Sequence, residues 1–315
     1  MNRQAREKYQ QLLALAKPLG PLRIAVIHPC DAPSLAGVAA ARREGLIDPL
    51  LVGPRAKVEA AARAAGIDLG DYELVDVPHS HAAAAQGVCL VREGRVDALM
   101  KGSLHTDELI AAVIDRELGL RTARRVSHCF IMDVPGHAQP LIITDAAINI
   151  APTLEEKVDI VQNAIDLAHA LQFTEVRVAI LSATESVNPK LPSTVEAAAL
   201  CKMAEREQIV GAMLDGPLAL DNAINPEAAA IKRLISPVAG RANVLVVPDL
   251  EAGNMLAKSL SFLAGADAAG IVVGARVPIV LTSRSDSLQA RLASCAVAVL
   301  LAHARMADTG KIVAT

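Results

Sequence analysis

Short runs of Val, Ile and Leu alternate along the chain with longer, alanine-rich segments. Most runs are apolar at consecutive positions, which is typical of strands covered by helices on both faces. Eleven runs predict strands, at residues 23–28, 48–53, 72–77, 96–102, 125–134, 140–145, 176–182, 209–215, 243–249, 270–274 and 278–282. This order predicts an α/β fold with mostly parallel sheets.

The segment 153–171 shows the helical period between two such runs. From Leu154 to Ala168, apolar residues recur at spacings of 4, 3, 4 and 3, which places them on one face of a helix. Thr153 and Glu156 have the spacing of a capping box, in which each side chain bonds to the other residue's backbone N–H. The segment therefore predicts a crossover helix that starts after Thr153.

Polar residues gather where the predicted strands end, and sheets of this kind bind ligands beyond the carboxyl ends of their strands. The clusters lie at 28–31, 101–106, 144–145, Ser182, 215–217, 248–249 and 282–284. Gly, Pro, Asp and Ser also build ordinary turns and helix caps. Each cluster taken alone therefore allows both a structural and a functional interpretation.

Composition excludes several classes of protein. Of 315 residues 52% are hydrophobic and only 2% are aromatic, with three Phe, two Tyr and no Trp, and the net charge is −3. A binder of single-stranded nucleic acid needs a basic groove and stacking rings, so we expect no nucleic-acid partner. The chain is long enough for two domains of roughly 150 residues.

Several features predict a cytoplasmic protein without a membrane partner. The apolar run at 296–302 is shorter than the roughly 20 residues that span a bilayer. Residues 1–20 are mixed in charge and lack the apolar stretch of a secretory signal. The five cysteines, at positions 30, 89, 129, 201 and 295, have neither disulfide-framework nor metal-site spacing.

Common cofactor and nucleophile motifs are absent from the sequence. It contains no G-x-G-x-x-G, no G-x-x-x-x-G-K-[ST], no H-E-x-x-H and no G-x-S-x-G. Dinucleotide sites, P-loops, zinc proteases and α/β-hydrolases are therefore disfavoured.

Six segments carry the strand-end polar groups. They are MKGSLHT (100–106), LRTARRVSH (120–128), TDAAINIAPTLEEK (144–157), LDGPLALD (214–221), SPVAGRANVLVVPDLEAGNMLAKSL (236–260) and PIVLTSRSDS (278–287). As an ordered set, they resemble the phosphate acetyltransferase and phosphate butyryltransferase family, over essentially the whole chain after about residue 20. INIAPTLEEK, LEAGNMLAKSL and VLTSRSDS are more similar to the butyryltransferase branch.

The resemblance implies reversible transfer of an acetyl, propionyl or butyryl group between coenzyme A and inorganic phosphate, through a ternary complex. Acyl-CoA, phosphate and acyl phosphate would be the partners, with coenzyme A as a substrate and with no permanently bound cofactor or metal. It implies an isocitrate/isopropylmalate dehydrogenase-like fold, with a first domain of 1–139 plus 288–315 and a second domain of 140–287. A homodimer would form through the second domain, and the active site would lie in the cleft between the domains.

Such a reaction needs cations for phosphate, donors for an oxyanion and a base for the thiol. Ser283 and Arg284 follow a predicted strand, and we expect Ser283 to cap a helix that runs to about residue 304. The resemblance implies that Ser283 stabilises the tetrahedral intermediate and that Arg284 binds phosphate or coenzyme A. Alternatively, Ser283 and Asp286 form only a capping box and Arg284 is a solvated charge.

The sequence departs from the family at the base. In the acetyltransferase branch a carboxylate lies seven residues after the motif serine, and here that position is Ala290. Asp286 lies one helical turn earlier and is the predicted replacement. Alternatively Asp286 only caps the helix, and another residue or no single residue takes the thiol proton, since positioning can supply much of the rate.

Further residues are predicted to bind substrate. Arg125 matches the family arginine of the R-V-S segment, and Lys101 and His105 flank a turn before a helix expected to begin near Thr106. His128 shares the cleft with Arg125 only if the strand bends, because residues three apart on a strand face opposite sides. The full set is Arg125, Lys101, Ser103, His105, His128, Asn149, Asp249 and Asn254.

Three further interpretations concern chemistry. Alanines at 146–147 replace a cysteine of the classical branch, which excludes a cysteine nucleophile there. The missing carboxylate at Ala290 favours, as an alternative, a non-catalytic module that binds acyl-CoA or acyl phosphate. A metal- and NAD-dependent decarboxylating dehydrogenase needs face-sharing carboxylates on a helix, which Asp249 and Glu251 do not provide.

The scarcity of aromatic residues also bears on the predicted ligand. The five rings are scattered along the sequence, so the adenine of coenzyme A cannot lie between stacked rings. Arginine planes, aliphatic side chains and main-chain groups would hold it instead. We therefore expect weak, mostly solvent-exposed binding of the nucleotide, with the reactive end of coenzyme A held more firmly.

Overall fold

A computed structural model describes residues 3–283 and 286–313, and all eleven predicted strands occur among them. The strands are β1 (Leu22–Ile27), β2 (Ile47–Gly53), β3 (Glu73–Asp76), β4 (Ala98–Lys101), β5 (Ser127–Asp133), β6 (Leu141–Thr144), β7 (Arg177–Leu181), β8 (Met213–Leu218), β9 (Val244–Val246), β10 (Asp267–Val273) and β11 (Ile279–Val280). The longer apolar runs therefore predicted the strands well.

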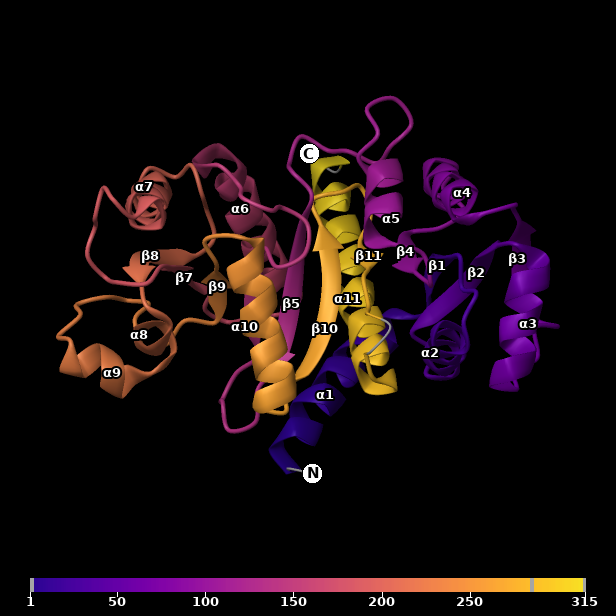
Figure 1. Cartoon of the computed structure of the whole chain (residues 1–315), viewed down its shortest axis with the longest axis horizontal. Helices are drawn as coiled ribbons and strands as arrows, with labels where there is room; N and C mark the ends of the chain where they lie inside the picture. The colour runs from indigo at the N-terminus through magenta and orange to yellow at the C-terminus, as the bar shows by residue number, and fades with distance from the viewer. Residues whose placement is uncertain (1–2, 284–285, 314–315) are drawn as a thin grey trace. The chain divides into compact units, whose positions relative to one another are not determined.

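Among the described residues, helices lie between most consecutive strands, though not between β5 and β6 or between β10 and β11 (Figure 1). They are α1 (Arg3–Ala16), α2 (Ala32–Arg43), α3 (Arg55–Ala65), α4 (Ser80–Arg92), α5 (Thr106–Val113), α6 (Leu154–Ala170), α7 (Pro192–Glu205), α8 (Leu220–Ile224), α9 (Pro226–Ile231), α10 (Leu250–Leu263) and α11 (Leu288–Val313), with a 3-10 turn at Lys17–Leu19. The capping box at the start of α6 is confirmed, because Thr153 Oγ1 accepts from Glu156 N and Glu156 Oε2 accepts from Thr153 N.

One strand begins later than the sequence predicted. The prediction was 209–215, whereas β8 spans Met213–Leu218. Val210 N donates to Gln162 Oε1 at 2.9 Å, and Gly211 has a φ of 89°, a left-handed conformation that no strand adopts. The residues before Met213 therefore form a loop that is hydrogen-bonded to Gln162 of α6.

The chain divides into two compact units. The first, called the continuous unit because Ser127–Ala268 makes up nearly all of it, also includes residues 3–5. The discontinuous unit comprises Arg6–Val126 together with the chain from Ala269 onward. The domain boundaries expected from the sequence, 139/140 and 287/288, lie further along the chain than these divisions.

The discontinuous unit contains a sheet in the order β3-β2-β1-β4-β11-β10. Neighbouring strands are parallel except β10 and β11. Its helices pack in two rows, α3 with α2 and α11, and α4 with α5 (Figure 1). β4 is buried along its whole length, and the residues that follow it lie at the carboxyl ends of the parallel strands.

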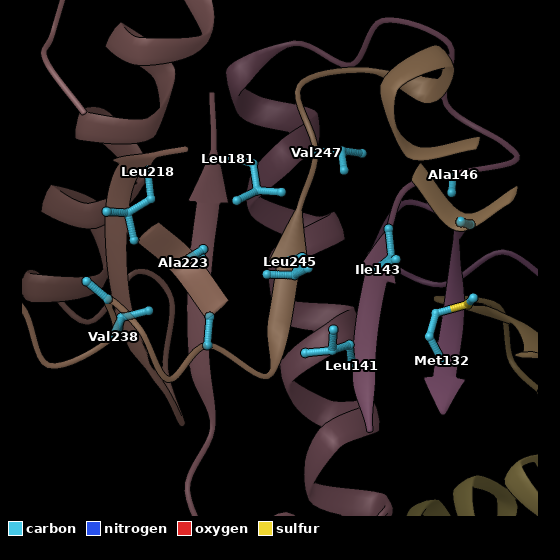
Figure 2. Packing of buried hydrophobic residues seen from close by; sticks show 14 of the residues in the cluster. Met132, Leu141, Ile143, Ala146, Leu181, Leu218, Ala223, Val238, Leu245 and Val247 are labelled. Atoms are coloured by element: carbon cyan, nitrogen blue, oxygen red, sulfur yellow. The ribbon is translucent and has the colours of Figure 1, made fainter. Parts of the chain in front are cut away.

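The continuous unit contains the order β5-β6-β9-β7-β8, in which only β5 and β6 run antiparallel. Figure 2 shows its apolar core, to which alternate residues of one strand, such as Leu141 and Ile143, contribute from the same face. Leu245, Leu181 and Leu218 continue this layer across the next three strands. The packed layer fixes the strand ends at which the polar residues lie.

Part of α11 is long and apolar enough to cross a membrane by length and composition. The stretch is Leu288–Ala307, and it extends beyond the uncharged run at 296–302. However, 72% of its most apolar window is buried inside the protein, and the helix packs on α2, β1 and β11. Such burial is typical of a core helix.

Candidate functional site

In the discontinuous unit, the carboxyl ends of three parallel strands meet. β4 lies between β1 and β11, with Lys101 paired to Ile27 and Met100 paired to Val280. The residues that follow these pairs are therefore neighbours at one edge of the sheet. They are His28, then Gly102 and Ser103, then Thr282 and Ser283.

Ser103 and His28 form a compact hydrogen-bonded pair at this edge. Ser103 N and Ser103 Oγ both lie within 2.9 Å of His28 O, and His28 Nδ1 lies 3.1 Å from Ser103 Oγ. Cys30 N donates to the same hydroxyl at 3.2 Å. His28 has a φ of 56°, which is uncommon outside glycine and turns its chain sharply after β1.

Gly102 allows the two strand ends to approach this closely. A Cβ at this position would lie 2.5 Å from Ile27 O and 2.6 Å from His28 O, both of them backbone atoms. Because no side chain fits between them, the glycine of the M-K-G-S segment is required by packing. The absence of a side chain at Gly102 allows Ser103 to hydrogen-bond with His28.

Lys101 and His105 occupy different environments around this turn. Lys101 is 6% exposed, and its Nζ lies 3.4 Å from Gly102 O. His105 is exposed and precedes α5, which begins at Thr106 as the sequence predicted. A buried ammonium at a strand end is a suitable partner for an anion.

The segment after β11 differs from the sequence prediction. Ser283 does not cap α11, which begins at Leu288, and Ser287 Oγ instead accepts from Ala290 N at 3.1 Å. Ser283 N donates to Asp286 Oδ2 at 2.6 Å, so the two predicted residues are bonded to one another ahead of the helix. Ser283 is exposed. Arg284 lies outside the described residues.

A buried arginine that the sequence analysis did not single out holds this segment in place. Arg291 is 3% exposed, and its guanidinium donates to Thr282 Oγ1 at 3.0 Å and to Ser283 O at 2.9 Å. A Cβ on Gly37 would lie 2.8 Å from Arg291 Cδ, so this glycine makes room for the side chain. Its position as the one charged residue in the apolar stretch 288–302 was the signal that could have identified it.

In the continuous unit, three predicted residues come together at the ends of β6 and β9, which are parallel neighbours. Asn149 lies in the loop after β6, and its Nδ2 donates to Asp145 Oδ2 at 2.6 Å. Asn254 Nδ2 donates across to Ala146 O at 3.3 Å. Asp249 caps α10 through Ala252 N at 2.8 Å.

Asp145 organises this loop. Its carboxylate accepts from Ala147 N, Ile148 N, Asn149 N and Asn149 Nδ2, and from His128 N, at 2.6–3.3 Å. Burial raises the pKa of Asp145, and the N–H donors oppose that shift. Sequence reasoning placed Asp145 at a strand end but assigned it no role.

His128 lies in the protein interior. It is 0% exposed, and its ring packs edge-on against Phe130 with 4.4 Å between ring centroids. Neither ring nitrogen has a hydrogen-bond partner among the described residues. Burial lowers the pKa of His128 to about 3, so the ring is neutral. The structure thus places His128 in the core, whereas Arg125 is exposed in the loop before β5.

A cavity of about 570 Å³ opens at the ends of β2 and β3. Its lining includes the aliphatic surfaces of Pro54, Val77 and Pro78, together with Arg55 and Glu59. None of these residues was predicted as part of a site. The cavity lies at the same carboxyl edge of the parallel strands as His28, because β1 and β2 run parallel.

Comparison with solved structures shows which class of protein this fold belongs to. A branched-chain phosphotransacylase from Enterococcus faecalis V583 matches with a TM-score of 0.78 and 32% identity, over 90% of this chain and 99% of the other. The predicted α/β fold class is therefore confirmed, and the class is that of the phosphotransacylases.

Sequence comparison identifies the family. The family model described as Phosphate acetyl/butaryl transferase matches residues 78–299. A phosphate acetyltransferase of Rhizobium meliloti is 64% identical over 95% of both chains, and a phosphate butyryltransferase of Clostridium acetobutylicum is 38% identical over 94% of this chain and 98% of the relative. The chain belongs to the phosphate acetyl/butyryl transferase family. The resemblance found in the sequence is confirmed, as is the assignment to the acyltransferases that act between coenzyme A and phosphate.

Proposed function

We propose that this protein transfers preferentially an acetyl group between coenzyme A and inorganic phosphate. We choose the acetyl group because the chain is 64% identical to a phosphate acetyltransferase but only 38% identical to a phosphate butyryltransferase. In the forward direction, a phosphate oxygen attacks the thioester carbonyl carbon, the C–S bond of the tetrahedral intermediate breaks, and the thiolate leaves. Acetyl phosphate and coenzyme A are the products.

The geometry at the ends of β4 and β11 supports this chemistry. Ser283 is an exposed hydroxyl on a backbone that Arg291 and Asp286 hold through Ser283 O and Ser283 N. We infer that its hydroxyl donates to the carbonyl oxygen as that atom becomes an oxyanion. Buried Lys101 is inferred to supply positive charge for phosphate, together with Arg284 and Arg125.

Further side chains supply the remaining proposed substrate contacts. Asn149, Asn254 and Asp249 are proposed to bind substrate in the continuous unit, where Asp145 fixes the loop that carries Asn149. His105 is proposed for the same role in the other unit, after a turn in which the Ser103 hydroxyl bonds to His28. A homodimer and a cytoplasmic location are proposed from the family resemblance and the composition.

A direct assay tests the proposed function. The protein is incubated with acetyl-, propionyl- or butyryl-CoA, with and without phosphate, and the released thiol is followed with a chromogenic thiol reagent. We expect phosphate-dependent release that is fastest with acetyl-CoA. A faster rate with butyryl-CoA would overturn the choice of acyl group.

A matched pair of serine variants tests the role of Ser283. Ser283→Ala is expected to lower kcat by about 10²-fold, as for loss of one oxyanion donor. Ser259→Ala, at an exposed serine of α10, serves as the control and is expected to retain the wild-type rate. Equal rates for the two variants would remove Ser283 from the site.

A second candidate function is supported by the missing carboxylate at position 290. Ala290 is 6% exposed and provides no base, so a module that binds acyl-CoA without turnover is the alternative. It predicts that calorimetry detects acyl-CoA binding while no acyl-CoA releases thiol. Turnover at any rate above the uncatalysed reaction excludes it.

A further inference from the structure

Position 290, where the acetyltransferase branch has a carboxylate, is an alanine in this chain, so another group must take the proton of the coenzyme A thiol. The hydrogen bonds around His28 point to a replacement. Three features of His28 bear on this: its tautomer, its charge and its place at the sheet edge. The inference rests on the proposed acyl transfer.

We infer the tautomer of His28 from the hydrogen bonds of Ser103. We assign the single proton of Ser103 Oγ to His28 O, 2.8 Å away, which also accepts from Ser103 N and Cys30 N. With this assignment the hydroxyl oxygen accepts from His28 Nδ1, at 3.1 Å, and from Cys30 N. Nδ1 then carries the proton, and the lone pair of the neutral imidazole lies on Nε2.

The second ring nitrogen is available to a ligand. No described residue forms a hydrogen bond with His28 Nε2, and the side chain is only partly buried. The left-handed backbone of His28, with a φ of 56°, is an uncommon conformation of the kind that clusters at functional sites. It is stabilised by the pairing of His28 O with both Ser103 N and Ser103 Oγ.

The charged groups around His28 come from three helices. Burial lowers the pKa of His28, and so does the charge of Lys57 on α3, whereas Glu108 on α5 and Asp31 at the start of α2 raise it. The net shift is downward, so the ring is neutral at pH 7. Cys30 beside it stays a thiol, because burial raises its pKa to about 11.

Two carboxylates at this edge each accept a backbone hydrogen bond through one oxygen. Asp31 Oδ1 accepts from Ser34 N as the cap of α2, and Asp286 Oδ2 accepts from Ser283 N at 2.6 Å. An ordinary carboxylate, with a pKa near 4, is also a weak base toward a thiol near 8.5, whereas an imidazole is closer to it. The neutral ring is thus the better-matched acceptor.

We propose that His28 is the general base of the acyl transfer, with Nε2 taking the proton of the coenzyme A thiol, and that Ser103 positions its ring. In the direction of acyl-CoA synthesis, the S–H bond breaks and its proton moves to Nε2. The sulfur electron pair forms the S–C bond with the carbonyl carbon of the acyl phosphate. The C–O bond to phosphate then breaks, phosphate leaves with that electron pair, and it takes up the proton that the imidazolium releases.

The backbone at position 28 allows a clean test. Asn tolerates the left-handed conformation, and its Nδ2 can replace the Nδ1–H donor to Ser103, but it has no counterpart of Nε2. His28→Asn is therefore expected to keep the wild-type melting temperature and acyl-phosphate KM, while kcat toward acetyl phosphate and coenzyme A falls by about 10² to 10⁴-fold. His81→Asn is the control, because His81 is exposed on α4, and it is expected to keep the wild-type kcat.

Chemical rescue and pH profiles provide independent readouts. Glycine also tolerates the φ of position 28, so His28→Gly is a second variant that should fold. Added imidazole is expected to raise the kcat of His28→Gly at least 10-fold over its value without imidazole. Wild-type kcat is expected to rise with pH through a limb below 6.5, and this limb disappears in His28→Asn. Ser103→Ala, which removes the acceptor of Nδ1–H, is expected to shift the limb, and Ser103→Thr to restore it.

The outcomes separate the two proposals. If His28→Asn keeps at least half of the wild-type kcat with an unchanged pH limb, the base is not His28. A loss of activity that imidazole does not rescue, together with a lowered melting temperature, also overturns the proposal, because it indicates a structural role. If the wild-type protein releases thiol from none of the three acyl-CoA substrates, the proposed function itself is refuted.

Discussion

Replacement of Asp145 by alanine is expected to release the loop after β6. Five N–H groups donate to this carboxylate, and two of the residues that supply them, His128 and Asn149, are 0% and 6% exposed. In the variant, donors near the surface can bond to water, whereas the buried ones cannot. A buried donor that loses a charged acceptor costs about 1.5–3 kcal/mol.

With at least two donors left unpaired, the expected loss is about 3–6 kcal/mol of local stability. Hydrogen–deuterium exchange of the peptide covering residues 141–152 measures this directly, because the amides of Ala147, Ile148 and Asn149 all bond to Asp145. Since 1.4 kcal/mol corresponds to a factor of ten, exchange at these amides should accelerate by about 10²-fold or more.

Two variants make the comparison specific. Asp145→Asn keeps one acceptor oxygen and is expected to show a smaller acceleration. Asp68→Ala removes an exposed carboxylate that accepts one backbone N–H, from Gly70 at 2.9 Å, and is expected to leave the peptide unchanged. Acceleration of less than about 10-fold in Asp145→Ala would refute the view that this carboxylate holds the loop.

Burial of His128 should make stability depend on pH, because its pKa is near 6.5 in the unfolded chain and about 3 in the folded one. The free energy of unfolding, measured by urea titration, should therefore fall by about 2 kcal/mol between pH 7 and pH 5. His128→Leu should lose this pH dependence, and an unchanged dependence in the variant would contradict the assignment. Gly102→Ala should destabilise by about 1–3 kcal/mol in urea through its 2.5 Å contact with Ile27 O, whereas Gly70→Ala should not. Arg291→Lys should lower kcat/KM about 10-fold, because one ammonium cannot hold both Thr282 and Ser283; wild-type kinetics would contradict this positioning.

The sequence predicted the elements whose cause is local. Continuous apolar runs indicated all eleven strands among the described residues, and Thr153 with Glu156 indicated the start of α6. Both signals act within a few residues. The sequence failed where distant contacts decide, as at 209–212, where the loop is held by Gln162 of α6.

The same distinction applies to the candidate site. Motifs suggested Ser283, Lys101 and Asn149 as site residues, because the resemblance is carried by contiguous residues, and these roles stay predictions. Arg291 and His28 were not selected, since their roles depend on partners at Thr282 and Ser103, which are 9 and 75 positions away along the chain. The start of α11 was wrong for a related reason: Ser287 rather than Ser283 provides the cap.

The order in which the units are encoded affects how the protein folds during synthesis. Ser127–Ala268, the main segment of the continuous unit, leaves the ribosome as one uninterrupted piece and can close its core at once. The other unit must wait, because β11, which pairs with β4, and α11, which packs on α2, emerge only after this segment. Until then the apolar surfaces of β4 and α2 stay uncovered. A nascent chain stalled before Ala269 should therefore bind hydrophobic chaperones through its first 126 residues.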